Sequence, residues 1–187
     1  MAVTATISAM NVRRLVPADA RPYRALMLEA YERHPDAFTS SVAERGALPL
    51  AWWESRLDPA PTALTVVSGA FEDGHLAGAV GLEFESRIKA RHKATLFGMV
   101  VAQTHRTRGI GARLVEAAIA EAHARPGVLL VQLTVSEGNR TARSLYERCG
   151  FILFSVEPMA IAVGGKFVAK EHMWRDLRID GTAAVAG

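Results

Sequence analysis

The stretch that decides the fold is FGMVVAQTHRTRGIGA, residues 97–112. An apolar run ends in a polar loop that contains Gly109 and Gly111, and a helix-forming sequence begins there. The first N–H groups of a helix lack intrahelical acceptors and lie at the positive end of its dipole, so this arrangement is typical of an anion-binding cradle. We expect the two glycines to remove Cβ atoms that would hold a phosphate away, and to permit a positive φ in the turn.

Hydrogen bonds from this loop should contribute more to phosphate binding than the helix dipole does. A charge-assisted N–H bond contributes about 1.5–3 kcal/mol, whereas the dipole contributes about 0.3–1 kcal/mol. The two glycines alone are weak evidence, because a dinucleotide fingerprint needs a third glycine and a phosphate-binding loop needs Gly-Lys-Ser/Thr. Neither motif occurs here, so glycines that serve only helix packing stay an alternative interpretation of this segment alone.

Outward from this loop, strand-like and helix-like patterns alternate along the chain. Apolar or alternating runs predict strands over residues 11–16, 64–71, 76–85, 94–102, 128–135, 151–156 and 167–177. Apolar residues at helical spacing predict helices that start at Asp19, lie around residues 50–57, and span 109–124 and 139–149. The order β-α-α-β-β-β-α-β-α-β-β is typical of a mixed α/β (α+β) sheet with helices on its faces.

Length and composition indicate one globular domain. The chain has 187 residues, of which 50% are hydrophobic and 22% charged, so disorder and fibrous repeats are not expected. We expect a domain over residues 11–179, with flexible segments at 1–10 and 180–187. The net charge of +3 is too small to predict nucleic-acid binding. No apolar run reaches the ~18 residues of a membrane span, and the first ten residues lack the basic region of a secretory signal, so a cytoplasmic protein is predicted.

The single cysteine and the scattered histidines favour neither a disulfide nor a metal site. Cys149 is the only cysteine, which excludes an intramolecular disulfide and a multi-cysteine zinc site. Since no histidine lies at a suggestive spacing, we interpret Cys149 as a small buried hydrophobic residue and not as a nucleophile. The six histidines show no metal-ligand spacing, so no metal is expected.

Two motifs resemble those of a known family. Arg106-x-x-Gly109-x-Gly111 resembles the Arg/Gln-x-x-Gly-x-Gly/Ala motif of the GNAT superfamily of acyl-coenzyme A-dependent N-acetyltransferases, although Gln103 stands where many relatives have proline. Residues 139–151, NRTARSLYERCGF, resemble the family's helix with Asn, Ala, Leu-Tyr and Gly-Phe, and residues 171–173 resemble its last strand. The resemblance extends from about residue 11 to 177. It implies a GNAT-like, mostly antiparallel central sheet with flanking helices.

The resemblance also implies a site for acetyl-coenzyme A, the acetyl donor. The main chain of Met99 and Val101, at the end of the fourth strand, should pair with the pantetheine amides, and the amides of residues 107–112 should surround the diphosphate. The residues implied in donor binding are Met99, Val100, Val101, Arg106, Thr107, Arg108, Gly109, Ile110, Gly111, Ala112 and Asn139. Asn139 has a second interpretation, as no more than the N-cap of its helix. The family's fourth and fifth strands separate, and the thioester reaches the acceptor through that opening.

The chemistry requires a base and a group that stabilises the leaving thiolate. A lysine-like amine has a pKa near 10.4 and must lose a proton before it attacks, so a base is expected. Glu83 and Glu85 lie on one face of the third strand, and we favour Glu83 because it lies deeper; a solvated strand face is the alternative for both. Tyr146 matches the family's usual general acid. It either protonates the thiolate, which is uphill by about 2 kcal/mol, or only donates a hydrogen bond.

We therefore predict an N-acetyltransferase that moves an acetyl group from acetyl-coenzyme A to a primary amine of a small molecule or peptide, by direct attack in a ternary complex. A longer acyl donor, a hydroxyl acceptor, and a catalytically idle acyl-coenzyme A sensor or scaffold are the alternatives. The acceptor pocket should lie near Tyr31, Phe38 and Trp52 and the final hairpin. Neither nucleic acid nor membrane is an expected partner, and a homodimer is expected only by analogy.

Overall fold

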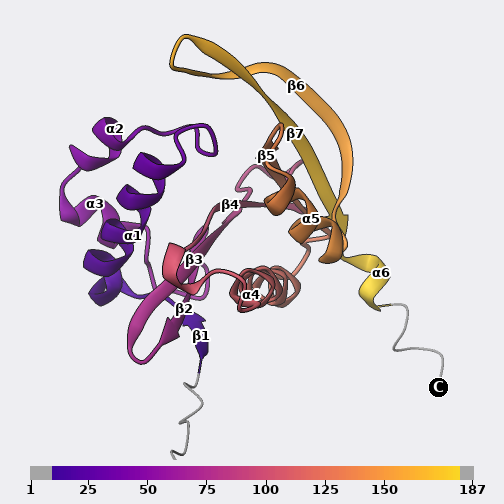
Figure 1. The fold of residues 1–187 in the computed structure, drawn as a ribbon. Coiled ribbons are helices and arrows are strands. Elements are labelled where there is room, and N and C mark those ends of the chain that lie inside the picture. Colours follow the sequence, from indigo (N-terminus) through magenta and orange to yellow (C-terminus); the bar gives the residue numbers. More distant parts are fainter. Residues whose placement is uncertain (1–9, 182–187) are drawn as a thin grey trace, which may run out of the picture.

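The computed structural model describes residues 10–181. In this range the chain forms a seven-stranded sheet in the order β1-β2-β3-β4-β5-β7-β6, with helices on both faces (Figure 1). The strands are β1 (Asn11–Arg14), β2 (Thr65–Glu72), β3 (His75–Phe84), β4 (Lys93–Val101), β5 (Leu130–Ser136), β6 (Ile152–Val163) and β7 (Lys166–Asp176). Only β4 and β5 are parallel, which confirms the mixed, mostly antiparallel sheet. The flexible segments predicted at 1–10 and 180–187 lie almost wholly outside the described residues.

The helices begin and end close to the predicted positions. They are α1 (Ala20–Arg33), α2 (Val42–Gly46), α3 (Leu50–Ser55), α4 (Ile110–Ala124), α5 (Arg140–Arg148) and α6 (Arg178–Gly181), with short 3-10 turns at Pro17–Asp19 and Gln103–His105. The helix α2 was not predicted, although Ser41 and Glu44 form a capping box around its first turn and that pattern is visible in sequence. The final hairpin is also longer than predicted, since β6 continues past residue 156 to Val163 through an irregular register.

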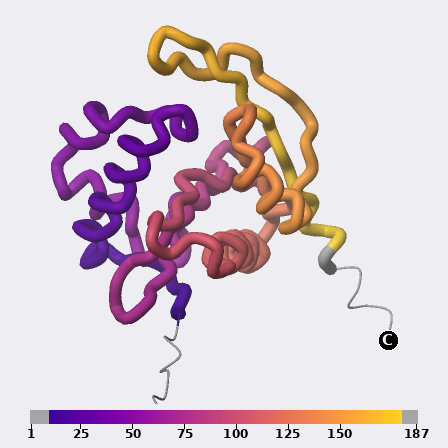
Figure 2. The backbone as a smooth tube through the Cα atoms, viewed as in Figure 1, coloured from indigo at the N-terminus to yellow at the C-terminus, as the bar shows by residue number. Residues whose placement is uncertain are grey.

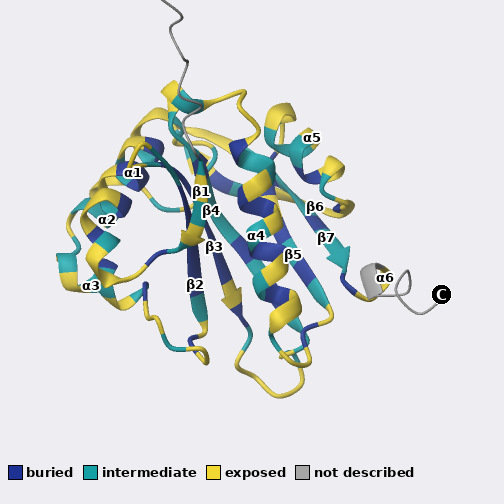
Figure 3. Cartoon of the chain, turned by 90° about the horizontal axis from the view of Figure 1, so that it is seen from below, coloured by how far each residue is buried: buried dark blue, intermediate teal, exposed yellow. Residues whose placement is uncertain are grey.

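Two cores hold the helices on opposite faces of the sheet. One core joins α1 and α3 to the sheet and includes Met27, Trp53 and Val100. The other joins α4 and α5 to the opposite face and includes Leu114 and Tyr146. In Figure 3, α4 crosses in front of the strands, with its buried side turned to them. Each apolar helix face is thereby removed from water, which supplies the main stabilisation of such a layered fold.

The sheet divides at its only parallel pair. The strands β4 and β5 are paired over residues 93–95 and 130–132 and not beyond. The register between β3 and β4 shifts between Ala79 and Gly81 of β3, which lie opposite Val100 and Phe97 of β4. In this part of β4, Gly98 adopts a positive φ of 59°. Such an irregularity bends a strand, so the last residues of β4 leave their edge toward β5 unpaired. Figure 2 shows the whole backbone, with α1–α3 on one side of the central strands and the β6–β7 hairpin on the other.

Candidate active site

A cavity of about 380 Å³ occupies the place where β4 and β5 separate. It is bounded by the last part of β4, the end of β5, the start of α5 and the helices α1 to α3. Its lining includes the following residues that the sequence singled out: Tyr31, Phe38, Trp52, Glu83, Met99, Asn139 and Tyr146. The structure thus brings one face of β3, the end of β4, the start of α5 and the N-terminal helices to one concave surface.

The loop between α1 and α2 forms the roof of the cavity, and two hydrogen bonds join it to residues 100 or more positions later in the chain. The hydroxyl of the buried Ser136, at the end of β5, donates a hydrogen bond to the carbonyl of Asp36. Lys170 of β7 donates from Nζ to Oγ1 of Thr39 at 2.7 Å. Both contacts hold the loop between α1 and α2 against the C-terminal half of the sheet, so the cavity is closed on this side by residues far apart in sequence.

Tyr146 lies at the inner wall of the cavity. Its side chain is 5% exposed and packs edge-on against Phe151, with ring centroids 5.9 Å apart. Burial raises the pKa of the Tyr146 phenol well above its usual 10 because the charged phenolate is poorly solvated there. The phenol is therefore neutral at every physiological pH and can act as a hydrogen-bond donor.

The two glutamates of the third strand have different environments. Glu83 is exposed and lines the cavity. Glu85 follows the last residue of β3 and is outside the cavity lining. Its carboxylate accepts hydrogen bonds from the Arg87 side chain and main chain, which lower the pKa of Glu85 to about 2. Such a carboxylate is a poor proton acceptor near neutral pH, so of the two only Glu83 combines access to the cavity with an available carboxylate.

The loop before α4 has the backbone that an anion cradle needs. Gly109 is the N-cap of α4 and adopts a left-handed conformation, φ 75° and ψ 3°. The first helical bond runs from the amide of Arg113 to the carbonyl of Gly109, so the amides of Ile110, Gly111 and Ala112 precede it and have no acceptor one turn earlier. The first turn carries no acidic residue. These N–H groups, at the positive end of a 15-residue helix, are available to an anion.

The two glycines serve different purposes, which corrects part of the sequence interpretation. Gly109 is required by its positive φ, and a Cβ there would meet nothing within 4 Å. The φ of Gly111 is not positive, and a Cβ there would lie 3.0 Å from Cδ2 of Leu145 and 3.4 Å from Cε of Met99. Gly111 therefore lets α4 approach α5. A positive φ was not predicted for Thr107, which adopts φ 66° in the same loop.

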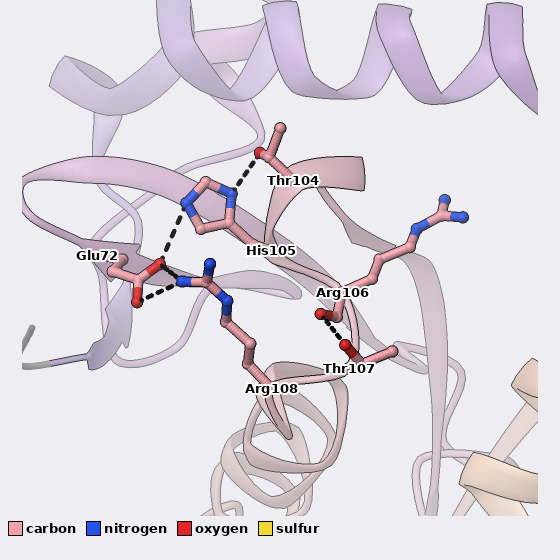
Figure 4. A network of polar contacts seen from close by, with 6 residues as sticks. All are labelled: Glu72, Thr104, His105, Arg106, Thr107 and Arg108. Atoms are coloured by element: carbon pink, nitrogen blue, oxygen red, sulfur yellow. Dashed lines mark hydrogen bonds and ion pairs between the residues drawn. The ribbon is translucent and has the colours of Figure 1, made fainter.

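The charged side chains of this loop are held by neighbouring elements (Figure 4). Glu72, at the end of β2, accepts two hydrogen bonds from Nη1 of Arg108, at 3.0 and 2.9 Å, and lies 3.2 Å from Nε2 of His105. The guanidinium of Arg106 points away from this cluster and donates to Nε2 of His34 at the end of α1, at 2.8 Å. These contacts fix the loop on both sides, so its main-chain amides are preorganised.

Asn139 performs the capping role. Its side-chain oxygen accepts a hydrogen bond from the amide of Ala142 at 3.2 Å, as an N-cap does. The residue also lines the cavity. Of the two interpretations of Asn139, capping is confirmed, and a contact with the donor stays a prediction.

Comparison with known proteins identifies the family. Residues 24–151 match the family model described as the acetyltransferase (GNAT) family. The chain belongs to this GNAT family. Membership makes the protein an acyltransferase, in a family that uses acetyl-coenzyme A.

Solved structures agree with this assignment. A GNAT-family acetyltransferase from Streptococcus pneumoniae is 26% identical, with a TM-score of 0.79, 90% of this chain covered and 99% of the other. A putative acetyltransferase from Salmonella typhimurium, solved with its cofactor acetyl-CoA, is 21% identical, with a TM-score of 0.75 and 91% and 95% covered. A ribosomal-protein-alanine N-acetyltransferase from Brucella melitensis is 22% identical, with a TM-score of 0.73 and 89% and 99% covered. No curated protein sequence matches the chain.

In this GNAT protein Cys149 is close to Tyr146 in the same core but is not part of the cavity lining. It is partly buried at the end of α5, and burial raises the pKa of its thiol. A raised pKa lowers the thiolate fraction and with it the nucleophilicity of the thiol. Within residues 10–181 no cluster of three or more His, Cys, Asp or Glu could hold a metal ion, and no helix there is long and apolar enough to cross a bilayer.

Sequence reasoning missed the cations of the cavity. Arg45, in α2, and Arg56, just after α3, line it together with Lys170 of β7. Their positions follow no motif, and α2 itself was not predicted. The capping box of α2 would have placed Arg45 on a helix, but only the packing of the N-terminal helices against the sheet brings the three cations together.

Proposed function

We propose that this GNAT protein transfers an acetyl group from acetyl-coenzyme A to a primary amine by direct attack in a ternary complex. The observation that carries the proposal is the shared cavity at the separation of β4 and β5, which is lined by both Tyr146 and Glu83. One group can stabilise the leaving thiolate while the other accepts the proton of the attacking amine. A catalytically idle sensor would need neither side chain in this place.

The donor would be held by main-chain groups along β4 and in the following loop. The edge of β4 that faces β5 has no strand partner beyond residue 95, so residues 99–101 can pair with the pantetheine amides as an additional strand would. The Val101 carbonyl accepts one long hydrogen bond, from Nε of Arg106 at 3.4 Å. The amides before Arg113, with the left-handed Gly109, suit the diphosphate. Arg106 and Arg108 fix this loop through His34 and Glu72. Because Arg108 is paired with the Glu72 carboxylate, the positive charge beside the loop comes mainly from Arg106.

In the reaction, the amine nitrogen forms a bond to the thioester carbon and the carbon–sulfur bond breaks. Glu83, directly or through a water molecule, accepts the proton that the amine must lose. Tyr146 donates a hydrogen bond to the sulfur as negative charge develops there. Because burial raises the pKa of Tyr146, full proton transfer to the thiolate is more unfavourable than for a free phenol, and hydrogen-bond donation is the role we assign.

Turnover of two variants and a matched control tests this assignment. Tyr146→Phe should lower kcat about tenfold or more with little change in acetyl-coenzyme A affinity, and Glu83→Gln should lower kcat about 100-fold or more near neutral pH, the lower end of the usual range for general base catalysis. Glu85→Gln is the control and should retain kcat. Saturable binding of acetyl-coenzyme A without acetylation of any amine by the unaltered protein would refute the proposal and support a sensor.

Two further assignments belong to the same proposal. A cytoplasmic location agrees with the single unpaired thiol of the chain. A homodimer is supported by β6, an edge strand that exposes Ile152, Phe154 and Val156. Such an apolar edge can pair in antiparallel fashion with the same strand of a second copy.

A further inference from the structure

The cavity at the separation of β4 and β5 carries an excess of positive charge. Arg45, Arg56 and Lys170 line it, and Glu83 is the only acidic residue in the described lining. A site for an acceptor with several positive charges, such as a polyamine, would be expected to show the opposite balance, because like charges at close range repel strongly when partly shielded from water.

Two of these cations are held by an aromatic ring and not by carboxylates. The Arg45 guanidinium lies 4.7 Å, and that of Arg56 5.0 Å, from the centroid of the Trp52 ring. Arg56 also lies 5.3 Å from the centroid of Phe97 on β4. Stacking on a ring fixes the position of a guanidinium and leaves its N–H donors available at the rim.

Neither arginine is held by a carboxylate within the described part of the chain. The pKa of the exposed Glu44, the residue before Arg45, is lowered by hydrogen bonds from Ser41 and, to a smaller extent, by the charge of Arg45. Arg45 donates from Nε to the hydroxyl of Ser40 at 2.9 Å, and neither it nor Arg56 forms an ion pair among residues 10–181. Both are partly buried. Partly buried guanidinium groups without an ion-pair partner lose part of their hydration. A bound anion would compensate for this, in bidentate fashion where it is a carboxylate or a phosphonate.

We infer that Arg45 and Arg56, positioned by Trp52, form an anion-binding subsite, and that the acceptor is a small amine that carries an acidic group on the same molecule. This inference rests on the proposed acetyltransferase function and deepens it. The acid binds at the arginines, the amine is directed toward Glu83 and the separation of β4 and β5, and Lys170 of β7 adds positive charge to the same cavity.

A comparison of amino acids with their own carboxamides tests the charge requirement. The two molecules have the same shape, and the amine of the carboxamide is less basic, so more of it is neutral at pH 7.5. Amine reactivity alone would therefore favour the carboxamide. With phenylalanine, methionine and lysine as probes, we expect kcat/KM of the unaltered enzyme to be about 10- to 100-fold higher for at least one acid than for its carboxamide, the effect of one charge-assisted hydrogen bond.

Variants assign the preference to the two arginines. In Arg45→Gln/Arg56→Gln the ratio of kcat/KM values should fall to within about threefold of unity, with acetyl-coenzyme A affinity unchanged. Arg33→Gln is the matched control, because Arg33 pairs with Glu29 outside the cavity lining, and it should keep the full preference. A second readout needs no turnover. Calorimetry should show tighter binding of the N-acetylated amino acid than of its carboxamide, and the difference should vanish in the double variant.

The outcomes separate this inference from the function on which it rests. Equal or better use of the carboxamides, with turnover intact, overturns the anion subsite and leaves the acetyltransferase. A preference for the acid that survives in the double variant also overturns it. Arginine-dependent binding of the acetylated acid without acetylation of any amine supports the subsite and overturns the proposed function. If neither binding of the acetylated acid nor turnover is observed, both the anion subsite and the proposed function are overturned.

Discussion

Replacement of Gly109 by alanine isolates the backbone requirement of the loop before α4. Gly109 adopts φ 75° and ψ 3°, and a Cβ at this position would meet nothing within 4 Å. The substitution therefore introduces no clash, and its cost is that of a left-handed backbone for a residue with a side chain, about 1–2 kcal/mol. We expect the free energy of unfolding, measured by urea denaturation, to fall by this amount.

The effect on donor binding should be larger than the effect on stability. If the loop relaxes to avoid the left-handed conformation, its amides move and at least one charge-assisted hydrogen bond to the diphosphate is lost, at about 1.5–3 kcal/mol. Isothermal calorimetry with acetyl-coenzyme A should therefore show a Kd about 10- to 100-fold higher. The assay is made at a temperature at which circular dichroism shows the variant to be folded.

Gly127 provides the matched control. It adopts φ 85°, also has open space at its Cβ position, and follows the far end of α4, about 22 Å from the loop for a 15-residue helix. Gly127→Ala should lose the same stability and leave acetyl-coenzyme A affinity unchanged. An undiminished affinity in folded Gly109→Ala, or an equal loss in Gly127→Ala, would refute the assignment of the loop as the diphosphate site.

Substitutions at Arg87, Ser136 and Phe154 have expected effects that can be measured. The Arg87 side chain holds the pKa of Glu85 near 2. Arg87→Gln should therefore return that pKa toward its ordinary value of 4.5, which NMR titration of the carboxyl can follow. Any stabilisation from the pair in the unaltered protein is present at neutral pH and is lost as the pH falls from about 4.5 toward 2. Ser136→Ala removes the hydrogen bond to the Asp36 carbonyl. We expect the free energy of unfolding to fall by about 0.5–1.5 kcal/mol and the KM for the amine to rise. Unchanged values of both would show that this bond does not fix the roof of the cavity. Phe154→Glu on the edge strand β6 should convert the proposed homodimer to a monomer in analytical ultracentrifugation, and a monomeric unaltered protein would exclude the dimer.

Local signals predicted the central part of the fold well. Three local features specify structure without long-range contacts: the apolar run before residue 102, the glycine at the start of α4, and the side chain of Asn139, which caps α5. Accordingly β4, α4 and α5 lie where they were expected. The limits of β6 were missed because Pro158 and Met159 interrupt the strand pattern, and Met159 adopts φ 53° without being glycine. Pairing with β7 continues the strand beyond this irregularity, and such long-range pairing leaves no local signal.

The candidate site was predictable only where it depends on a motif. Tyr146 and Gly109 belong to motifs, so the sequence was sufficient to single them out. The difference between Glu83 and Glu85 depends on where β3 ends and on the Arg87 side chain, which the alternation of the strand does not reveal. The cations that line the cavity come from segments that tertiary packing brings together, so sequence spacing could not group them.

In the proposed complex, the thioester lies between the separated strands β4 and β5, beside Tyr146. An experimental structure of the complex with acetyl-coenzyme A, or with a non-hydrolysable thioether analogue, tests it most directly. We expect the diphosphate on the amides that follow Gly109, and the sulfur within hydrogen-bonding distance of the Tyr146 hydroxyl. A donor bound with its sulfur outside this cavity, or with its diphosphate away from the start of α4, would contradict the account.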